Sequence, residues 1–96
     1  MSFFSKILGP KVDYAELVHN GAKVIDVRTV GEFATGNAEV SQNLPLQDID
    51  RWKKQFKKGE KVIVVCRSGA RAGSAKRILE SQGCEVYNAG AWQNLR

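Results

Sequence analysis

Residues 62–71 have the sequence VIVVCRSGAR, in which four β-branched apolar residues lead directly into a cysteine. Uninterrupted apolar runs of this kind are typical of a buried strand at the centre of a parallel sheet. A loop with one glycine and two arginines follows, and residues 72–82 then show the apolar spacing of a helix that Gly83 ends. The sequence therefore predicts that Cys66 lies at the junction between a buried strand and a helix.

Strands and helices alternate along the rest of the chain. Besides residues 62–65, the patterns predict strands at residues 11–12, 23–27, 42–44 and 84–87, and helices at residues 14–20, 30–35 and 48–57. This alternation predicts an α/β fold, with a parallel sheet of about five strands flanked by helices on both faces. We expect residues 1–10 to be a loose N-terminal lead-in and residues 11–96 to form a single domain. Ligands of such sheets bind outside the carboxyl ends of the strands, which is where Cys66 lies.

Two of the expected helices begin with the spacing of a capping box. Asp13 is followed three residues later by Glu16, and Thr29 is followed at the same spacing by Glu32. In this motif the first side chain binds a backbone N–H of the helix, and the second side chain binds back to the first residue. We therefore expect helices to start directly after Asp13 and Thr29.

The composition limits the classes of protein to which the chain can belong. It has 96 residues, 43% of them hydrophobic, and a net charge of +5, which indicates one folded domain. Two cysteines are too few for a disulfide scaffold, and there is no CxxC or Cys/His ligand set, so we expect no metal and no cofactor. The first residues show neither a basic region nor a long apolar run, so no signal peptide or membrane span is expected and the predicted location is the reducing cytoplasm.

A basic run extends from the third predicted helix to the start of the central strand, at Lys53, Lys54, Lys57, Lys58 and Lys61. The simpler interpretation is a solvated helix face. The alternative is a surface that docks an acidic partner protein or attracts small anions. Nucleic acid is not expected, because the run lacks the interleaved exposed aromatic residues of a stacking platform. We expect a monomer without a membrane partner.

The residues around Cys66 suggest a reactive thiol. The thiolate is the nucleophilic form, and a helix N-terminus, a loop of inward-facing N–H groups around Gly69, and the charges of Arg67 and Arg71 would each stabilise it. The single histidine, His19, is distant in sequence, which gives little support to a Cys–His pair. The alternative for Cys66 is a small buried apolar residue. The arginines and glycine directly after it argue against that reading, because they are poor core residues.

Several segments, in order along the chain, resemble the rhodanese family of sulfurtransferases. They are VIDVR at residues 24–28 with Glu32 and Phe33 after it, NLPL at residues 43–46, the strand and loop at residues 62–71, and residues 83–92. The likeness extends over nearly the whole domain, so the chain resembles a single-domain rhodanese.

The resemblance implies that Cys66 is a nucleophile that takes the outer, sulfane sulfur of an anionic donor such as thiosulfate or a persulfide. Cys66 would carry this sulfur as a persulfide and pass it to a thiol, a partner protein or cyanide. The resemblance also implies that the persulfide is held by the loop, made of Arg67, Ser68, Gly69, Ala70 and Arg71. Arg71, together with Arg67, would bind the donor.

The length of the loop separates the alternatives within this fold. Residues 67–70 separate Cys66 from Arg71. The resemblance implies that rhodanese-fold proteins that act on phosphate or arsenate have a loop one residue longer. The shorter loop fits a single sulfur atom better than a tetrahedral oxyanion. Sulfur transfer is therefore favoured over a phosphatase or arsenate reductase activity. A non-catalytic sulfur-carrier or partner-binding module is the other alternative, and the presence of Cys66 with its cationic loop argues against it.

Two positions depart from the family pattern. Asn37 stands where a histidine is common, and Ala89-Gly90 stands where a pair of glycines is common. Outside the loop, Asp26 and Arg28 end a strand at the same sheet edge as Cys66. There they would support the loop, form an ion pair or pair with Glu32, and direct contact with the substrate is the less favoured alternative. Cys84 has no cationic residues beside it in sequence, which predicts a buried, inert thiol.

Overall fold

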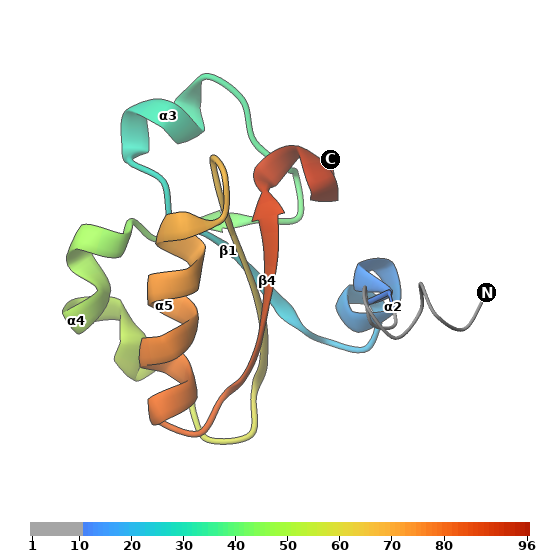
Figure 1. The fold of residues 1–96 in the computed structure, drawn as a ribbon, viewed down its shortest axis with the longest axis vertical. Coiled ribbons are helices and arrows are strands. Elements are labelled where there is room, and N and C mark those ends of the chain that lie inside the picture. The colour runs from blue at the N-terminus through green and yellow to red at the C-terminus, as the bar shows by residue number, and fades with distance from the viewer. Residues whose placement is uncertain (1–10) are drawn as a thin grey trace, which may run out of the picture.

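The computed structural model describes residues 11–96 (Figure 1). The predicted lead-in at residues 1–10 lies outside the described residues. The elements, in chain order, are α2 Tyr14–His19, β1 Lys23–Asp26, α3 Val30–Ala34, β2 Gln42–Asn43, the 3-10 turn η1 Leu46–Asp48, α4 Ile49–Trp52, the 3-10 turn η2 Lys53–Gln55, β3 Lys61–Cys66, α5 Ala70–Ser81, β4 Glu85–Ala91 and the 3-10 turn η3 Trp92–Leu95.

The strands form one parallel sheet with the spatial order β2-β1-β3-β4. The predicted α/β fold with a parallel sheet is therefore confirmed, and four strands are described. The short strand expected at residues 11–12 is wrong, because these exposed residues lie outside the sheet. The most apolar strand, β3, lies in the interior of the sheet between β1 and β4, as its uninterrupted apolar run predicts.

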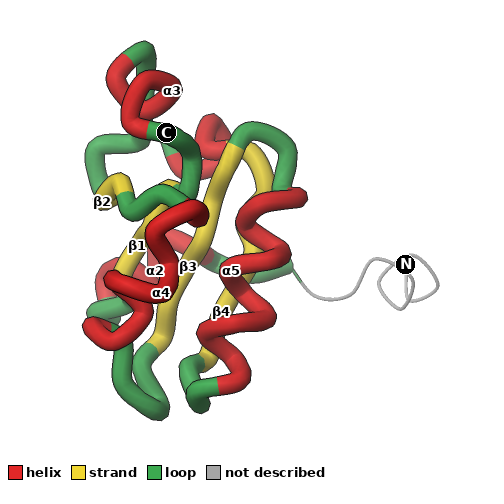
Figure 2. Tube along the Cα trace, turned by 90° about the vertical axis from the view of Figure 1, so that its left-hand side faces the viewer, coloured by secondary structure: helices red, strands yellow, loops and turns green. Residues whose placement is uncertain are grey.

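Helices cover both faces of the sheet, and alternate residues of β3 contact opposite layers. Val62, Val64 and Cys66 belong to a buried cluster with α4 and α5, whose members include Trp52 and Leu79. Ile63 and Val65 belong to a second cluster on the other face, against side chains of α2 and η3. Figure 1 shows α4 and α5 on one side of the strands and α2 on the other, and Figure 2 shows α4 and α5 in front of the strands.

The predicted helix at residues 48–57 is shorter and less regular than expected. It consists of α4 followed by the 3-10 turn η2, which ends at Gln55. The Gln82 side chain donates hydrogen bonds to the carbonyls of Lys53 and Phe56, and the Glu60 carboxylate accepts one from the N–H of Lys57. Side chains from elsewhere therefore bind the backbone groups that would otherwise extend the helix.

The helix starts agree with the capping prediction, one fully and one in part. Thr29 and Glu32 form a complete capping box at the start of α3. Asp13 caps α2 by accepting a hydrogen bond from the N–H of Glu16, but only this half of the motif forms. In residues 11–96 no helix is long and apolar enough to cross a membrane.

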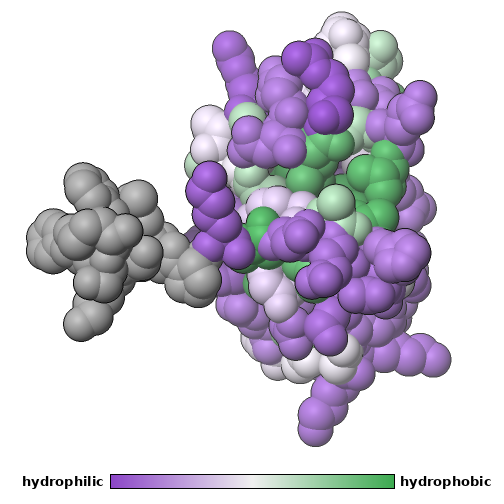
Figure 3. Space-filling model, turned by 90° about the vertical axis from the view of Figure 1, so that its right-hand side faces the viewer, coloured by the Kyte–Doolittle hydropathy of each residue, from purple (hydrophilic) through white to green (hydrophobic). Residues whose placement is uncertain are grey.

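A small apolar groove lies on the face of the molecule that carries α2. It has a volume of about 300 Å³ and is lined by Tyr14, Ala15, Val18, Val40 and Leu95. Figure 3 looks onto this side of the molecule and shows apolar residues gathered among hydrophilic ones. Cys66 belongs to the buried cluster on the opposite face of the sheet, so the groove is not part of its surroundings.

Candidate active site

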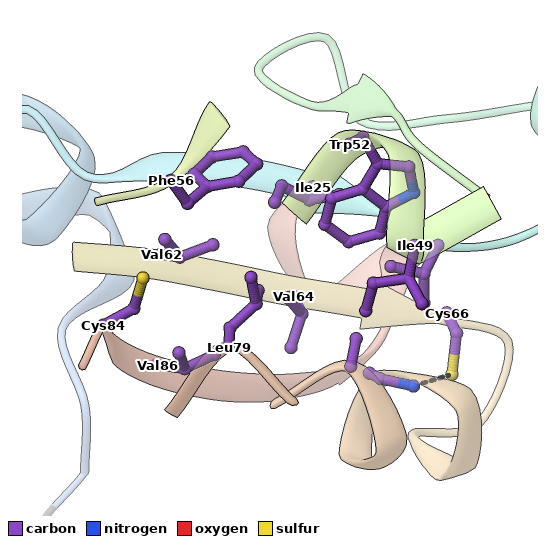
Figure 4. Close-up of a cluster of buried hydrophobic side chains, with 13 residues drawn as sticks. Ile25, Ile49, Trp52, Phe56, Val62, Val64, Cys66, Leu79, Cys84 and Val86 are labelled. Carbon is purple, nitrogen blue, oxygen red and sulfur yellow. Dashed lines mark hydrogen bonds between the residues drawn. The ribbon is translucent and has the colours of Figure 1, made fainter. Parts of the chain in front are cut away.

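Cys66 is the last residue of β3, and its side chain points toward the N-terminus of α5. Its Sγ accepts a hydrogen bond from the N–H of Gly69 at 2.9 Å and a longer one from the N–H of Ala72 at 3.4 Å. One of these contacts is drawn as a dashed line in Figure 4. The strand-to-helix junction predicted from the sequence thus presents main-chain donors to the sulfur, an arrangement that favours an anion.

Two opposing effects act on the pKa of the Cys66 thiol, and the combined effect of the hydrogen bonds is the larger one. Burial raises its pKa, because it disfavours the charged form. The backbone N–H groups of Ala72, Ser68, Gly69 and Arg71 lower it, and the net result is a pKa below the ordinary value of 9.0. The groups that lower the pKa of the Cys66 thiol are therefore main-chain N–H groups of the loop and of the first turn of α5.

The loop obtains its shape from Gly69 and from Asn88 on the neighbouring strand. Gly69 has a φ of 102°, in the left-handed region that glycine adopts without strain. The Asn88 amide donates a hydrogen bond to the Gly69 carbonyl at 2.9 Å, and its oxygen accepts one from the N–H of Gly90 at 2.9 Å. Asn88 therefore fixes the loop to β4, a role that our sequence reasoning missed.

A bulge in β4 brings Asn88 to this position. Val64 of β3 pairs with Asn88, but the next residue, Val65, pairs with Gly90, so Ala89 is the additional residue. Gly90 has a φ of 79°, and Ala89 is buried. An asparagine and a glycine inside a strand are unusual, and this pair was the available signal for the bulge.

The Arg71 guanidinium is bound by the carboxylate of Glu32. Two hydrogen bonds join them, Nη1 to Oε1 at 2.6 Å and Nη2 to Oε2 at 3.0 Å. The Arg71 guanidinium beside Glu32 and the N–H of Thr29 lower the pKa of that carboxyl to about 2, so Glu32 is ionised at neutral pH. Arg71 thus offers its backbone N–H to the Cys66 sulfur while its side-chain charge is already paired.

Asp26 and Arg28 form an ion pair with each other. Both are buried, and the guanidinium of Arg28 donates to the Asp26 carboxylate from Nε at 3.0 Å and from Nη2 at 2.7 Å. Arg28 also donates to the carbonyls of Glu32 and Gly36 and lies over the ring of Trp92, with 4.8 Å to its centroid. The expected ion pair is therefore present, but pairing with the Glu32 carboxylate is wrong, since that group binds Arg71.

The remaining loop residues all lie at the surface. Arg67, Ser68 and Ala70 are exposed, and Ser68 contributes its N–H to the thiolate. Among residues 11–96, Arg67 forms no ion pair. Its guanidinium is thus the loop charge that stays available to a ligand.

The family departure at Asn37 has a local explanation. The Asn37 side chain donates a hydrogen bond to the Phe33 carbonyl at 2.9 Å. The same carbonyl also accepts a hydrogen bond from the N–H of Gly36 at 3.2 Å, so the Asn37 side chain adds a second donor at the end of α3. Asn37 therefore stabilises the end of α3, the helix that carries Glu32.

Cys84 lies at the end of the sheet opposite to Cys66. It directly precedes Glu85, which pairs with Lys61 at the start of β3, whereas Cys66 ends that strand. The two ends of β3 are about 16 Å apart at roughly 3.3 Å per residue, too far for a disulfide between the two thiols. Burial raises the pKa of the Cys84 thiol, and Figure 4 shows both cysteines at opposite ends of the buried cluster.

The basic run lies at that same distant end. Lys61 begins β3, and Lys58 contacts Gly83 beyond the C-terminal end of α5, whereas Cys66 faces the N-terminal end of that helix. Screening in physiological salt reduces interactions between exposed charges beyond about 8 Å. The run is therefore badly placed to attract small anions to Cys66. Within the described part of the chain, no group of three or more metal-ligating side chains comes together.

The fold and the Cys66 loop define a class of protein, and comparison with known families agrees with it. The Rhodanese-like domain family matches residues 11–94, so the chain belongs to the rhodanese-like family. Its relatives include proteins named as sulfurtransferases. One of them, the "Sulfurtransferase" of Allochromatium vinosum, is 35% identical over 60 residues, which cover 62% of this chain and 56% of the relative.

Solved structures share the fold. A rhodanese with anions from E. coli is 30% identical, with a TM-score of 0.68, over 77% of this chain and 91% of that one. The reduced CoADR-RHD of Bacillus anthracis has a TM-score of 0.73 and 28% identity, over 84% of this chain and 14% of that much longer one. This chain spans between 37% and 59% of the lengths of the curated relatives that it matches.

Proposed function

We propose that the chain is a sulfurtransferase in which Cys66 carries the transferred sulfur as a persulfide. The observation that carries the proposal is the pair of main-chain N–H groups, of Gly69 and Ala72, that donate to the Cys66 sulfur. Donors placed at this point stabilise the thiolate before the reaction and a charged terminal sulfur after it. Membership of the rhodanese-like family and the names of relatives support the same activity.

The first half of the reaction loads the enzyme. The Cys66 thiolate attacks the outer sulfur of thiosulfate, a new S–S bond forms, and the bond between the two sulfurs of the donor breaks. Sulfite leaves with that electron pair, so Cys–S⁻ and S₂O₃²⁻ give Cys–S–S⁻ and SO₃²⁻. A histidine base is not part of this step, because the main-chain N–H groups that lower the pKa of Cys66 favour its thiolate form.

The second half returns the enzyme to its starting state. A nucleophile such as a thiolate or cyanide attacks the terminal sulfur of the persulfide, and the Cys66 thiolate is the leaving group. With cyanide the product is thiocyanate. Because the two substrates react in separate steps around a covalent intermediate, the kinetics are ping-pong.

Intact-mass measurement tests the loading step. After incubation with thiosulfate, the protein gains about 32 mass units, one sulfur atom, and cyanide removes this sulfur as thiocyanate. Cys66→Ser gains nothing, whereas the matched variant Cys84→Ser, which removes the distant thiol, is loaded like the wild type. A wild type that takes no sulfur from any sulfane donor, yet hydrolyses an aryl phosphate, would show that sulfur transfer is the wrong activity.

A further inference from the structure

The pairing of Arg71 with Glu32 changes what the site offers to an anion. Arg71 is the loop cation that the resemblance assigns to donor binding, yet both nitrogens at the end of its side chain are bound to Glu32 oxygens. Glu32 comes from α3, which Figure 1 shows at the same end of the molecule as the loop that leads into α5. A donor that binds Arg71 must therefore share it with a carboxylate.

The charges of the Cys66 loop and of the two ion pairs beside it nearly cancel. Asp26 with Arg28, and Glu32 with Arg71, are pairs of opposite charge. Arg67 is the loop arginine that has no such carboxylate partner among residues 11–96. Its positive charge is matched by the negative charge of Cys66 when Cys66 reacts as the thiolate. From these groups, an approaching dianion thus meets main-chain dipoles and one free guanidinium but no net positive charge.

We propose that Glu32 selects the sulfur donor by charge: by neutralising Arg71, it makes the site favour donors with one negative charge over donors with two. This inference rests on the proposed sulfurtransferase function and narrows its substrate class. Glu32 acts through Arg71 and is therefore a positioning residue.

The pair is positioned to have this effect. The side chains of Arg71 and Glu32 are 35% and 33% exposed, so a donor can reach them. Glu32 is ionised throughout the neutral range, because its pKa is about 2. A second negative charge on the donor adds a further repulsion with Glu32, whose size grows as water is excluded from the site.

Two donors of matched chemistry differ by this one charge. Thiosulfate is a dianion, and benzenethiosulfonate is a monoanion with the same outer sulfur on an oxidised sulfur atom. In both reactions the Cys66 thiolate forms an S–S bond to the outer sulfur. Sulfite leaves from the first donor and benzenesulfinate from the second, each with the electron pair of the broken S–S bond, so neither reaction needs an oxidant or reductant.

The test compares kcat/KM for both donors in the wild type and in Glu32→Gln, with cyanide as acceptor. Glutamine keeps a side-chain oxygen for the capping box of α3 and for Arg71 but removes the charge. We expect kcat/KM to rise about tenfold for thiosulfate and about threefold for benzenethiosulfonate. The reason is that the repulsion by Glu32 is lost for two negative charges on the dianion and for one on the monoanion. Glu85→Gln, which removes the same charge at the distant end of the sheet, leaves the ratio unchanged.

The outcomes separate this inference from the proposed function. Equal changes for both donors in Glu32→Gln would overturn the selection by charge, since a purely structural role affects both alike. The wild type gives a second test without any variant: its kcat/KM for thiosulfate changes little with salt, and a steep fall with salt would overturn the inference. Failure of both donors to load wild-type Cys66 would instead overturn the sulfurtransferase function itself.

Discussion

At the scale of single residues, the site depends on main-chain atoms that a few side chains hold in place. The Cys66 sulfur is bound by N–H groups, and these groups point inward because Gly69 adopts a left-handed conformation. Asn88 holds the carbonyl of Gly69 from the neighbouring strand. The reactivity of the thiol is therefore sensitive to a residue that does not touch the sulfur.

Asn88→Ala tests this dependence. The substitution removes hydrogen bonds to Gly69 and Gly90, so we expect a loss of roughly 1–2 kcal/mol in the free energy of unfolding. We also expect a higher pKa of Cys66, measured as the pH midpoint of its alkylation by iodoacetamide. The midpoint lies below 9.0 in the wild type and moves toward 9.0 in the variant.

Asn94→Ala is the matched control, because Asn94 donates to the Ala89 carbonyl of the same strand and not to the loop. It lowers stability but leaves the alkylation midpoint unchanged. An unchanged midpoint in Asn88→Ala would contradict the proposed role of Asn88.

At the scale of elements, the short helix α3 is held by contacts at both ends. It has only five residues, too few to be stable alone, and its capping box and the Asn37 side chain bind its terminal backbone groups. Glu32 serves both in the capping box and as the partner of Arg71 in α5. One carboxylate therefore joins two helices across the carboxyl edge of the sheet.

This carboxylate predicts a specific acid sensitivity. The pKa of Glu32 is about 2 in the folded protein, below its ordinary 4.5, so its stabilisation is complete above pH 4.5 and is lost as the pH falls toward 2. Urea unfolding measured across this range should show a smaller loss of stability in Glu32→Gln than in the wild type. Glu85→Gln should follow the wild type. If the free energy of unfolding fell with pH in parallel for the wild type and Glu32→Gln, this would contradict the link between protonation of Glu32 and stability.

At the scale of the whole molecule, Arg28 connects parts that are far apart in the chain. It binds Asp26 at the end of β1, the carbonyls of Glu32 and Gly36, and the ring of Trp92 near the C-terminus. The pair of Arg28 and Asp26 is buried, so neither charge can be left without its partner at low cost. This connection fixes how α3 and the C-terminal turn lie on the sheet edge.

Arg28→Ala should therefore lower the free energy of unfolding by about 3–5 kcal/mol, because it leaves the buried Asp26 carboxylate unpaired. The double variant Asp26→Ala with Arg28→Ala should lose less than the sum of the two single variants, since the second change removes the unpaired group. Chemical denaturation of all four proteins measures this coupling. Strictly additive losses would show that the two side chains do not act as a pair.

Much of the fold followed from local patterns. The apolar run of β3, the alternation of strands and helices and the box of Thr29 and Glu32 all express preferences of neighbouring residues, and the structure agrees with them. Residues 11–12 lack such a pattern, and the prediction of a strand there was wrong. The length of the helix at residues 48–57 was overestimated, because side chains outside it bind its last backbone groups. Gln82 is distant in sequence, and Glu60 lies beyond the end of the predicted helix.

The position of Cys66 between an apolar strand and a helix, beside a glycine and two arginines, can be predicted from the amino-acid order alone. That information is local, because strand, loop and helix are consecutive in the chain. The partners of these residues depend instead on how the chain folds: Arg71 binds Glu32, 39 residues away, and Gly69 binds Asn88, 19 residues away. Such pairs depend on strand order, on the bulge in β4 and on the packing of α3, none of which a short stretch of sequence specifies.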